Sequence, residues 1–187
     1  GIEQQRPGYS LQTPDDEYDT DQVVVTTPAD VAADLLDGVA ENTDALAELT
    51  YNPLALVYLA ADELPAGLGY QVAYDEDLHT LGVSFNGAMF DRDGLCTVFL
   101  GGMHDPEILA QSDDQLGEIA TTEFERATGH EADVVDIVRR DRWFPAYDQT
   151  WWGLEDVTTP DGVHLATNYT ARMGIPSRVR EARGLAD

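Results

Sequence analysis

The middle of the chain carries the clearest pattern of apolar and polar positions, and this pattern predicts a β-sheet. Residues 54–60 form a continuous apolar run of strand length, typical of a central strand buried on both faces. Residues 70–74, 80–85 and 95–100 follow, separated by short turn-forming links. These short links predict an antiparallel meander of the four strands. Apolar and charged residues alternate over residues 133–143, which predicts a further strand.

One long segment has the signals of a helix that packs on this sheet. Residues 114–128 place Leu116 and Phe124 on one mainly apolar face at helical spacing. Ser112 marks the start of the segment and Gly129 follows its last residue, as expected at the two ends of a helix.

The first fifty residues predict a hairpin and two helices. Residues 9–13 and 21–27 have strand character, and the polar link between them has the composition of a hairpin turn. Residues 28–36 follow as a helix with proline in its first turn. A second helix is predicted over residues 43–49, with Asn42 as its cap.

The end of the chain predicts a strand that leads into a helix. Residues 163–166 are apolar, and a loop through Gly174 delivers the chain to a helical stretch at residues 178–186. A strand that feeds a helix N-terminus presents unpaired backbone N–H groups and a partial positive charge, which suit an anion or an electron-rich ring edge. The chain is therefore predicted to be α+β, with a mixed, largely antiparallel sheet and helices packed on it.

Composition adds a strong acidic bias to this picture. The 187 residues include 36 acidic and ten basic side chains, which gives a net charge of -26, and all the basic side chains are arginine. The hydrophobic content of 43% is too high for a disordered chain. The acids are spread along the whole chain, so we expect a globular protein adapted to molar salt, from a halophile, where a Debye length of about 3 Å screens self-repulsion. No basic stripe exists, so nucleic-acid binding is not expected.

The sequence indicates no metal site, disulfide or membrane span. Cys96 is the single cysteine, and its place in an apolar run favours a buried structural thiol. The four histidines are far apart, and no cysteine or histidine lies at zinc spacing. No apolar stretch reaches membrane length and no targeting signal is present, so we expect a cytoplasmic protein. Two origins stay open for the chain, a natural stand-alone protein and a piece of a longer one.

Several segments, in order along the chain, resemble the C-terminal half of the protoporphyrinogen oxidases within the flavin-dependent amine oxidase superfamily. The most specific is TVFLGGMHDPEIL at residues 97–109. The other similar segments are VVVTTPADVAADLL at 23–36, PLALVYLA at 53–60, LGVSFNGAMF at 81–90, SDDQL at 112–116, RWFPAY at 142–147 and HLATNYTARMGIP at 164–176.

This resemblance implies a domain plan and a cofactor. Residues 1–50 would be a remnant of an FAD-binding domain, residues 51–150 a substrate-binding domain, and residues 151–187 the closing strand and helix of the FAD-binding domain. The parent enzyme would oxidise a porphyrinogen, a tetrapyrrole-like substrate, by moving hydrides to FAD. No residue of this chain is implied as a catalytic acid or base.

The resemblance also implies site residues. Met173, Gly174 and Ile175 match the family's flavin-contacting stretch. Leu59, Phe85 and Met89 fall near positions that line the family's tetrapyrrole pocket, although a plain core role fits each of them equally well.

The sequence departs from the family at its phosphate-binding elements. Thr167 and Arg172 stand where the family usually has glycine, and no Gly-x-Gly-x-x-Gly occurs in the chain. The isolated chain is therefore expected to lack FAD, and a missing N-terminal FAD-binding part is its candidate partner. Two alternatives stay open: another enzyme of the superfamily that acts on an amine or a carotenoid precursor, and a non-catalytic binding or interaction module.

Overall fold

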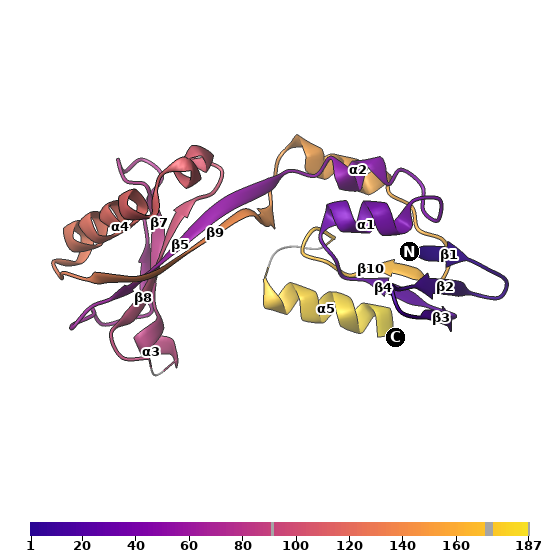
Figure 1. Ribbon diagram of the computed structural model, residues 1–187, viewed down its shortest axis with the longest axis horizontal. Helices are drawn as coiled ribbons and strands as arrows, with labels where there is room; N and C mark the ends of the chain where they lie inside the picture. Colours follow the sequence, from indigo (N-terminus) through magenta and orange to yellow (C-terminus); the bar gives the residue numbers. More distant parts are fainter. Residues whose placement is uncertain (91, 171–173, 187) are drawn as a thin grey trace. The chain divides into compact units, whose positions relative to one another are not determined.

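The structure is a computed structural model, and it describes residues 1–90, 92–170 and 174–186. The chain divides into two compact units. The central unit is Tyr51–Phe144, and the split unit combines Gly1–Thr50 with Pro145–Asp187. Both units mix helices with strands (Figure 1), so the predicted α+β class is confirmed.

The central unit is built on a five-stranded sheet in the order β6-β7-β8-β5-β9. Its strands are β5 (Tyr51–Ala60), β6 (Gly69–Gln71), β7 (Thr80–Phe85), β8 (Leu95–Gly101) and β9 (Asp133–Pro145). Its helices are α3 (Asn86–Phe90), the 3-10 helix η1 (Pro106–Ala110) and α4 (Asp113–Thr128). The β6–β7, β7–β8 and β8–β5 pairs are antiparallel, which agrees with the predicted character of the sheet.

The strand order of this sheet corrects the predicted meander. Only β6, β7 and β8 follow one another, whereas β5 lies on the far side of β8 and pairs with it over seven residues, from Leu54 to Ala60. A strand that precedes β6 in sequence therefore lies between β8 and β9. Its position explains why both faces of the 54–60 run are apolar, because a central strand is covered on both sides more than an edge strand.

The core of the central unit lies between one face of the sheet and α4. Val57, Val98 and Val83 are buried side by side on β5, β8 and β7. Leu116, Ala120 and Phe124 of α4 pack against this face, with the 3.6-residue spacing that the sequence predicted. Each large apolar side chain buried here stabilises the fold by about 1.5–3 kcal/mol.

Both ends of α4 are fixed by local interactions. The Ser112 hydroxyl accepts a hydrogen bond from the Gln115 backbone N–H, and the Gln115 side chain accepts one from the Ser112 N–H, forming a capping box. Gly129 ends the helix with a φ of 77°, a left-handed conformation that glycine adopts without a steric penalty. The predicted helix and its stop signal are confirmed.

The split unit joins elements from the two ends of the sequence. β1 (Ile2–Gln4), β2 (Tyr9–Gln12) and β3 (Glu17–Thr20) form an antiparallel sheet, and β4 (Val23–Val25) pairs in parallel with β10 (Val163–Leu165). The helices of this unit are α1 (Ala29–Leu36), α2 (Asp44–Ala47), the 3-10 helix η2 (Gln149–Asp156) and α5 (Ile175–Ala186).

Two predictions for the first fifty residues were wrong in detail. The hairpin partner of β2 is β3, because the turn at residues 13–16 already reverses the chain, and the β-branched segment at β4 pairs with β10 instead. Asn42 does not cap α2. Its φ is 58°, and its side-chain amide donates to the Asp156 carbonyl at 2.8 Å, which ties the start of α2 to the end of η2.

Candidate functional site

The two faces of the central sheet differ in what covers them. Residues directly opposite each other in an antiparallel pair share a face, so the register assigns each side chain to one face or the other. The helix-covered face meets α4 and η1. The other face, which we call the open face because α4 and η1 do not cover it, carries the buried Leu56 and Thr97 and the half-buried Tyr58, Phe99 and Ser84.

Leu59 and Phe85, two of the predicted substrate contacts, lie together on the helix-covered face. Leu59 is opposite Cys96 and Cys96 is opposite Phe85, so the three side chains form a row across β5, β8 and β7. All three are buried in the cluster that α4 seals. Met89 lies apart from this row, on α3, and is 37% exposed. Substrate contact by these residues stays a prediction, and the sealed row under α4 gives it no support.

The helix-covered face also holds two ionisable side chains that the sequence did not single out together. Burial raises the pKa of the Cys96 thiol to about 11, and burial with the nearby Cys96 and Glu123 raises the pKa of the Tyr70 phenol to about 12. Tyr70 also packs edge-on against Phe85, with ring centroids 6.1 Å apart. Both groups are therefore neutral near pH 7 and serve as core side chains.

The open face has a different chemistry. Tyr58, Phe99 and Ser84 are half-buried, so they retain surface that a ligand could cover. Thr97 is buried, and its hydroxyl accepts a 2.7 Å hydrogen bond from the Asn86 side-chain amide. This bond anchors the first residue of α3 to β8. The result is a surface of aromatic rings beside satisfied polar groups, which suits a flat, largely apolar ligand.

One polar cluster of the central unit is structural. The Glu123 carboxylate on α4 accepts hydrogen bonds from the backbone N–H groups of His79 and Thr80, at 2.9 and 2.8 Å. The imidazole of His79 contacts Asp105 at 2.6 Å. These contacts fasten the start of β7 to α4 and to the segment that leads into η1.

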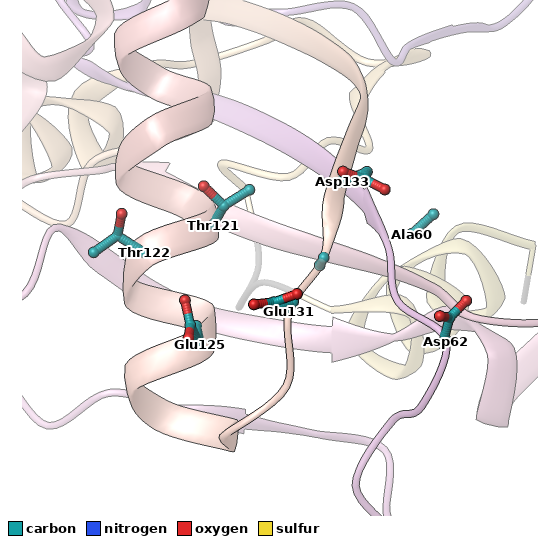
Figure 2. Close-up of a pocket in the computed structure, with 8 residues that line it drawn as sticks. Ala60, Asp62, Thr121, Thr122, Glu125, Glu131 and Asp133 are labelled. Carbon is teal, nitrogen blue, oxygen red and sulfur yellow. The ribbon is translucent and has the colours of Figure 1, made fainter.

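A hollow of about 390 Å³ lies where α4 faces the ends of β5 and β9 (Figure 2). Its carboxylates are Asp62, Glu125, Glu131 and Asp133. Within the described ranges, no group of three or more acidic, histidine or cysteine side chains has the geometry of a metal site. The hollow is therefore an acidic surface feature, and it gives no support to a metal site within the described ranges.

In the split unit, the candidate cofactor site lies at the carboxyl ends of the parallel strands β4 and β10. Ligands of α/β sheets bind at such ends. The chain continues from β4 through Thr27 into α1, and the Tyr169 hydroxyl donates to the Thr27 carbonyl at 3.1 Å. The Thr27 hydroxyl is buried and has no hydrogen-bond partner among the described residues, which leaves a polar group unsatisfied at this edge of the unit.

The predicted flavin-contacting stretch follows β10. Gly174 has a φ of 112°, and among the described residues beyond its chain neighbours a Cβ added there would meet only Pro176 Cδ, at 3.9 Å. Ile175 begins α5 and is 79% exposed. Met173 lies outside the described residues. Contact of this stretch with a flavin stays a prediction, and the described residues around Gly174 are compatible with it.

Thr167 departs from the family pattern without blocking the loop. It is buried, and its hydroxyl accepts a 3.3 Å hydrogen bond from the Tyr169 N–H. Thr170 in turn donates to the Glu181 carboxylate of α5 at 2.5 Å, and Glu181 pairs with Arg178 at 3.0 Å. The side chain that replaces the family's glycine therefore turns into the loop and stabilises it.

Beside this loop the split unit has an apolar hollow that the sequence did not reveal. It has a volume of about 370 Å³ and includes Trp151, Leu165 and Tyr169. Trp151 reaches it from η2, where its ring packs on Tyr147 with centroids 4.6 Å apart. The only sign of this hollow in the sequence is the aromatic pair Trp151-Trp152. The sequence alone does not show that this pair lies near β10.

Among the described residues, no helix has both the length and the apolar character needed to cross a membrane.

The chain is 30% identical over 178 residues to the coproporphyrinogen III oxidase of Mycobacterium tuberculosis (strain ATCC 25618 / H37Rv). That match covers 88% of this chain and 39% of the relative, so the chain spans about two fifths of the relative's length. It is also 30% identical over 122 residues to protoporphyrinogen oxidase 2, chloroplastic/mitochondrial, of Arabidopsis thaliana, over 57% of this chain and 24% of that protein.

Solved structures share the fold at lower identity. A triple mutant of putrescine oxidase superposes with a TM-score of 0.73 at 15% identity and covers all of this chain and 46% of its own. An oxidoreductase from Methanosarcina mazei gives 0.67 at 13% identity, again over all of this chain and 48% of its own. Residues 1–183 match the sequence profile described as flavin containing amine oxidoreductase. The chain belongs to this flavin-dependent amine oxidase family.

Proposed function

We propose that this chain is the substrate-binding part of an FAD-dependent oxidase that converts a porphyrinogen to a porphyrin. Family membership supports oxidoreductase chemistry with a flavin, and the two relatives named for porphyrinogen oxidation support the substrate class. The observation that carries the proposal is the open face of the central sheet, because it presents half-buried aromatic rings on rigid strands.

The open face fits a flat macrocycle. Phe99 lies opposite the buried Leu56, and Tyr58 lies opposite the buried Thr97 on the same face, so the surface that remains for a ligand comes from two neighbouring aromatic rings. Side chains of this kind bind a planar ring by area burial and stacking. Because they project from paired strands, their positions are fixed before the ligand binds, which lowers the entropy cost of binding.

The role proposed for the split unit is contact with the cofactor. When bound, FAD supplies the acceptor for the hydride equivalents that leave a porphyrinogen. Gly174 and Ile175, together with Met173, are the residues that would contact it, and the Thr27 hydroxyl is a candidate donor to it. The sequence has no Gly-x-Gly-x-x-Gly, so the present residues fit part of the cofactor and do not include its usual pyrophosphate site.

The proposal assigns different roles to the two faces. Leu59 and Phe85 would support the sheet from beneath α4, whereas Tyr58 and Phe99 would contact the substrate. The sequence resemblance had placed Leu59, Phe85 and Met89 at the substrate. Substitutions can be made on each face separately, and their effects on ligand affinity show which of the two groups of residues contacts the substrate.

The test of the substrate class is an equilibrium titration of the chain with coproporphyrin III. We expect a saturable shift of the porphyrin's Soret band with one site per chain, measured in molar KCl so that the ligand's carboxylates are screened from the acidic protein. Putrescine is the control ligand and should not displace the porphyrin. The proposed substrate class would be contradicted if the Soret band did not change throughout the titration, or if putrescine displaced the bound porphyrin.

A further inference from the structure

β9 is an edge strand with an open outer side. It ends the order β6-β7-β8-β5-β9, so no described strand pairs with its outer edge. It is 13 residues long, and Val134 and Val135 are 42% and 58% exposed. A long edge with exposed β-branched side chains is a template for another strand, and natural proteins either protect such an edge or use it.

The charges of β9 differ from those of the rest of the chain. The strand contains three aspartates and three arginines, so it is neutral in a protein with a net charge of -26. The charges are also sorted. Asp133 and Asp136 lie in its first half, whereas its second half contains all three arginines, Arg139, Arg140 and Arg142, together with Asp141. Three of the ten basic residues of the whole chain are therefore gathered on the end of one edge strand.

A hollow of about 540 Å³ runs beside the acidic half of β9, between this strand and α4. Five carboxylates line it: Asp113, Asp114, Glu118, Asp133 and Asp136. Its apolar part includes Val134 and Gly117, and a Cβ added to Gly117 would come within 3.0 Å of Val134 Cγ2. The hollow thus combines an apolar floor with a dense negative rim beside an open strand edge.

The three arginines of the basic half differ in their contacts within the chain. Arg139 binds Asp113 and donates to the Gln111 carbonyl at 2.7 Å. The guanidinium of Arg142 lies 4.4 Å from the centre of the Tyr51 ring. Arg140 is exposed, and its guanidinium donates only to the carbonyl of the preceding residue among the described contacts. Arg140 is therefore the residue best placed to reach a partner.

We propose that β9 is a dimerisation edge, and that its partner is the β9 of a second copy of this chain in antiparallel orientation. Antiparallel pairing about the centre of the strand places the acidic half of each copy beside the basic half of the other. In a register centred on Val138, Asp136 comes opposite Arg140 twice, once on each side of the two-fold axis. Parallel pairing would instead set Arg140 beside the arginines of the second copy, so charge selects the antiparallel arrangement.

A second copy is favoured over a different partner because the strand is complementary to itself. The rest of the surface repels another molecule of the same charge, but β9 is neutral, and its Asp136 and Arg140 lie two residues on either side of Val138. In the dimer the two strands form a continuous sheet through backbone hydrogen bonds, and Arg140 of each copy meets Asp136 of the other.

The test is a charge swap read by light scattering on the 187-residue chain in molar KCl. The unmodified chain should have twice its 20.5 kDa monomer mass at micromolar concentration. Asp136→Arg alone and Arg140→Asp alone each place like charges opposite each other twice, and each should raise the dimer dissociation constant about tenfold or more. An equimolar mixture of the two variants restores both attractive pairs, and it should form a heterodimer with an affinity close to that of the unmodified chain.

The control is Glu3→Arg, the same kind of charge reversal on β1 in the split unit, which should leave the dimer unchanged. Recovery of the dimer on mixing also shows that both variants are folded. A monomer mass for the unmodified chain up to 0.1 mM would overturn the proposal, and so would variants that dimerise separately as well as they do together. Either result would leave the proposed substrate face untouched, because β9 carries none of its residues.

Discussion

At the scale of the residue, Leu59 shows what alternation along a strand can and cannot predict. The sequence predicted that Leu59 shares a face with Val57 and Ala55, and all three are buried in one cluster. It could not predict which face α4 covers, because Leu54 and Leu56 on the other face are also apolar and also buried. The choice depends on the path of the chain from β8 to α4, and no pattern within β5 encodes that path.

Truncation of Leu59 should destabilise the chain strongly. The side chain is fully buried, so Leu59→Ala leaves a cavity beneath α4, and we expect the unfolding free energy to fall by about 2–5 kcal/mol. Leu68→Ala makes the same chemical change at a side chain that is 67% exposed, and should cost less than about 1 kcal/mol. Chemical denaturation of both variants measures the difference. Equal losses would mean that Leu59 is not sealed in the core.

At the scale of the element, the helices and strands with complete local signals were predicted well. α4 has a start signal, an apolar face and a terminal glycine, and the structure confirms all three. β7, β8 and β9 were recognised from their composition. The pairing of β2 with β3, the short α3 and the position of β5 were not predicted, because each depends on which turn forms or on contacts between distant segments.

The capping box of α4 provides a prediction at this scale. Ser112→Ala removes the hydroxyl that accepts from the Gln115 N–H, and the unfolding free energy should fall by about 1 kcal/mol. Ser112→Asp keeps an acceptor at the N-cap and should retain most of that stability. Thermal unfolding followed by far-UV circular dichroism compares the two. An aspartate variant that loses as much as the alanine variant would show that the cap does not depend on the acceptor.

At the scale of the whole molecule, the charge and the family could be predicted from the sequence alone, whereas the candidate substrate site could not. The acidic bias was visible at once, and the ordered motifs pointed to the family that the comparisons then showed. The open face was not foreseen, because Tyr58, Phe99 and Ser84 are far apart in sequence and meet only through the register of three strands. The position of Thr27 likewise depends on the pairing of β4 with β10.

The net charge predicts how stability depends on salt. With 36 acidic and ten basic side chains, repulsion acts on the compact state when ions are removed, so the melting temperature should fall steadily between 3 M and 0.1 M KCl. A series of thermal melts at fixed pH measures this dependence. A melting temperature that stays constant or rises on dilution would contradict adaptation to molar salt.

The missing phosphate-binding element predicts weak retention of the cofactor. No Gly-x-Gly-x-x-Gly occurs in the sequence, and backbone N–H groups of such an element bind the pyrophosphate of FAD in dinucleotide-binding folds. The purified chain should therefore be colourless, even after incubation with FAD and gel filtration in molar salt. Visible absorption measures the flavin content, and a yellow protein with nearly one flavin per chain would refute this expectation.

The open face of the central sheet is proposed to bind the substrate, and one pair of variants distinguishes it from the helix-covered face. Phe99→Leu and Phe85→Leu make the same change on neighbouring strands, on the open face and the helix-covered face respectively. We expect Phe99→Leu to weaken coproporphyrin III binding about tenfold with little change in melting temperature, because a stacking ring is lost from the surface. Phe85→Leu should lower the melting temperature and leave the affinity unchanged. The reverse pattern, with affinity lost in Phe85→Leu and kept in Phe99→Leu, would place the substrate on the other face and contradict the account.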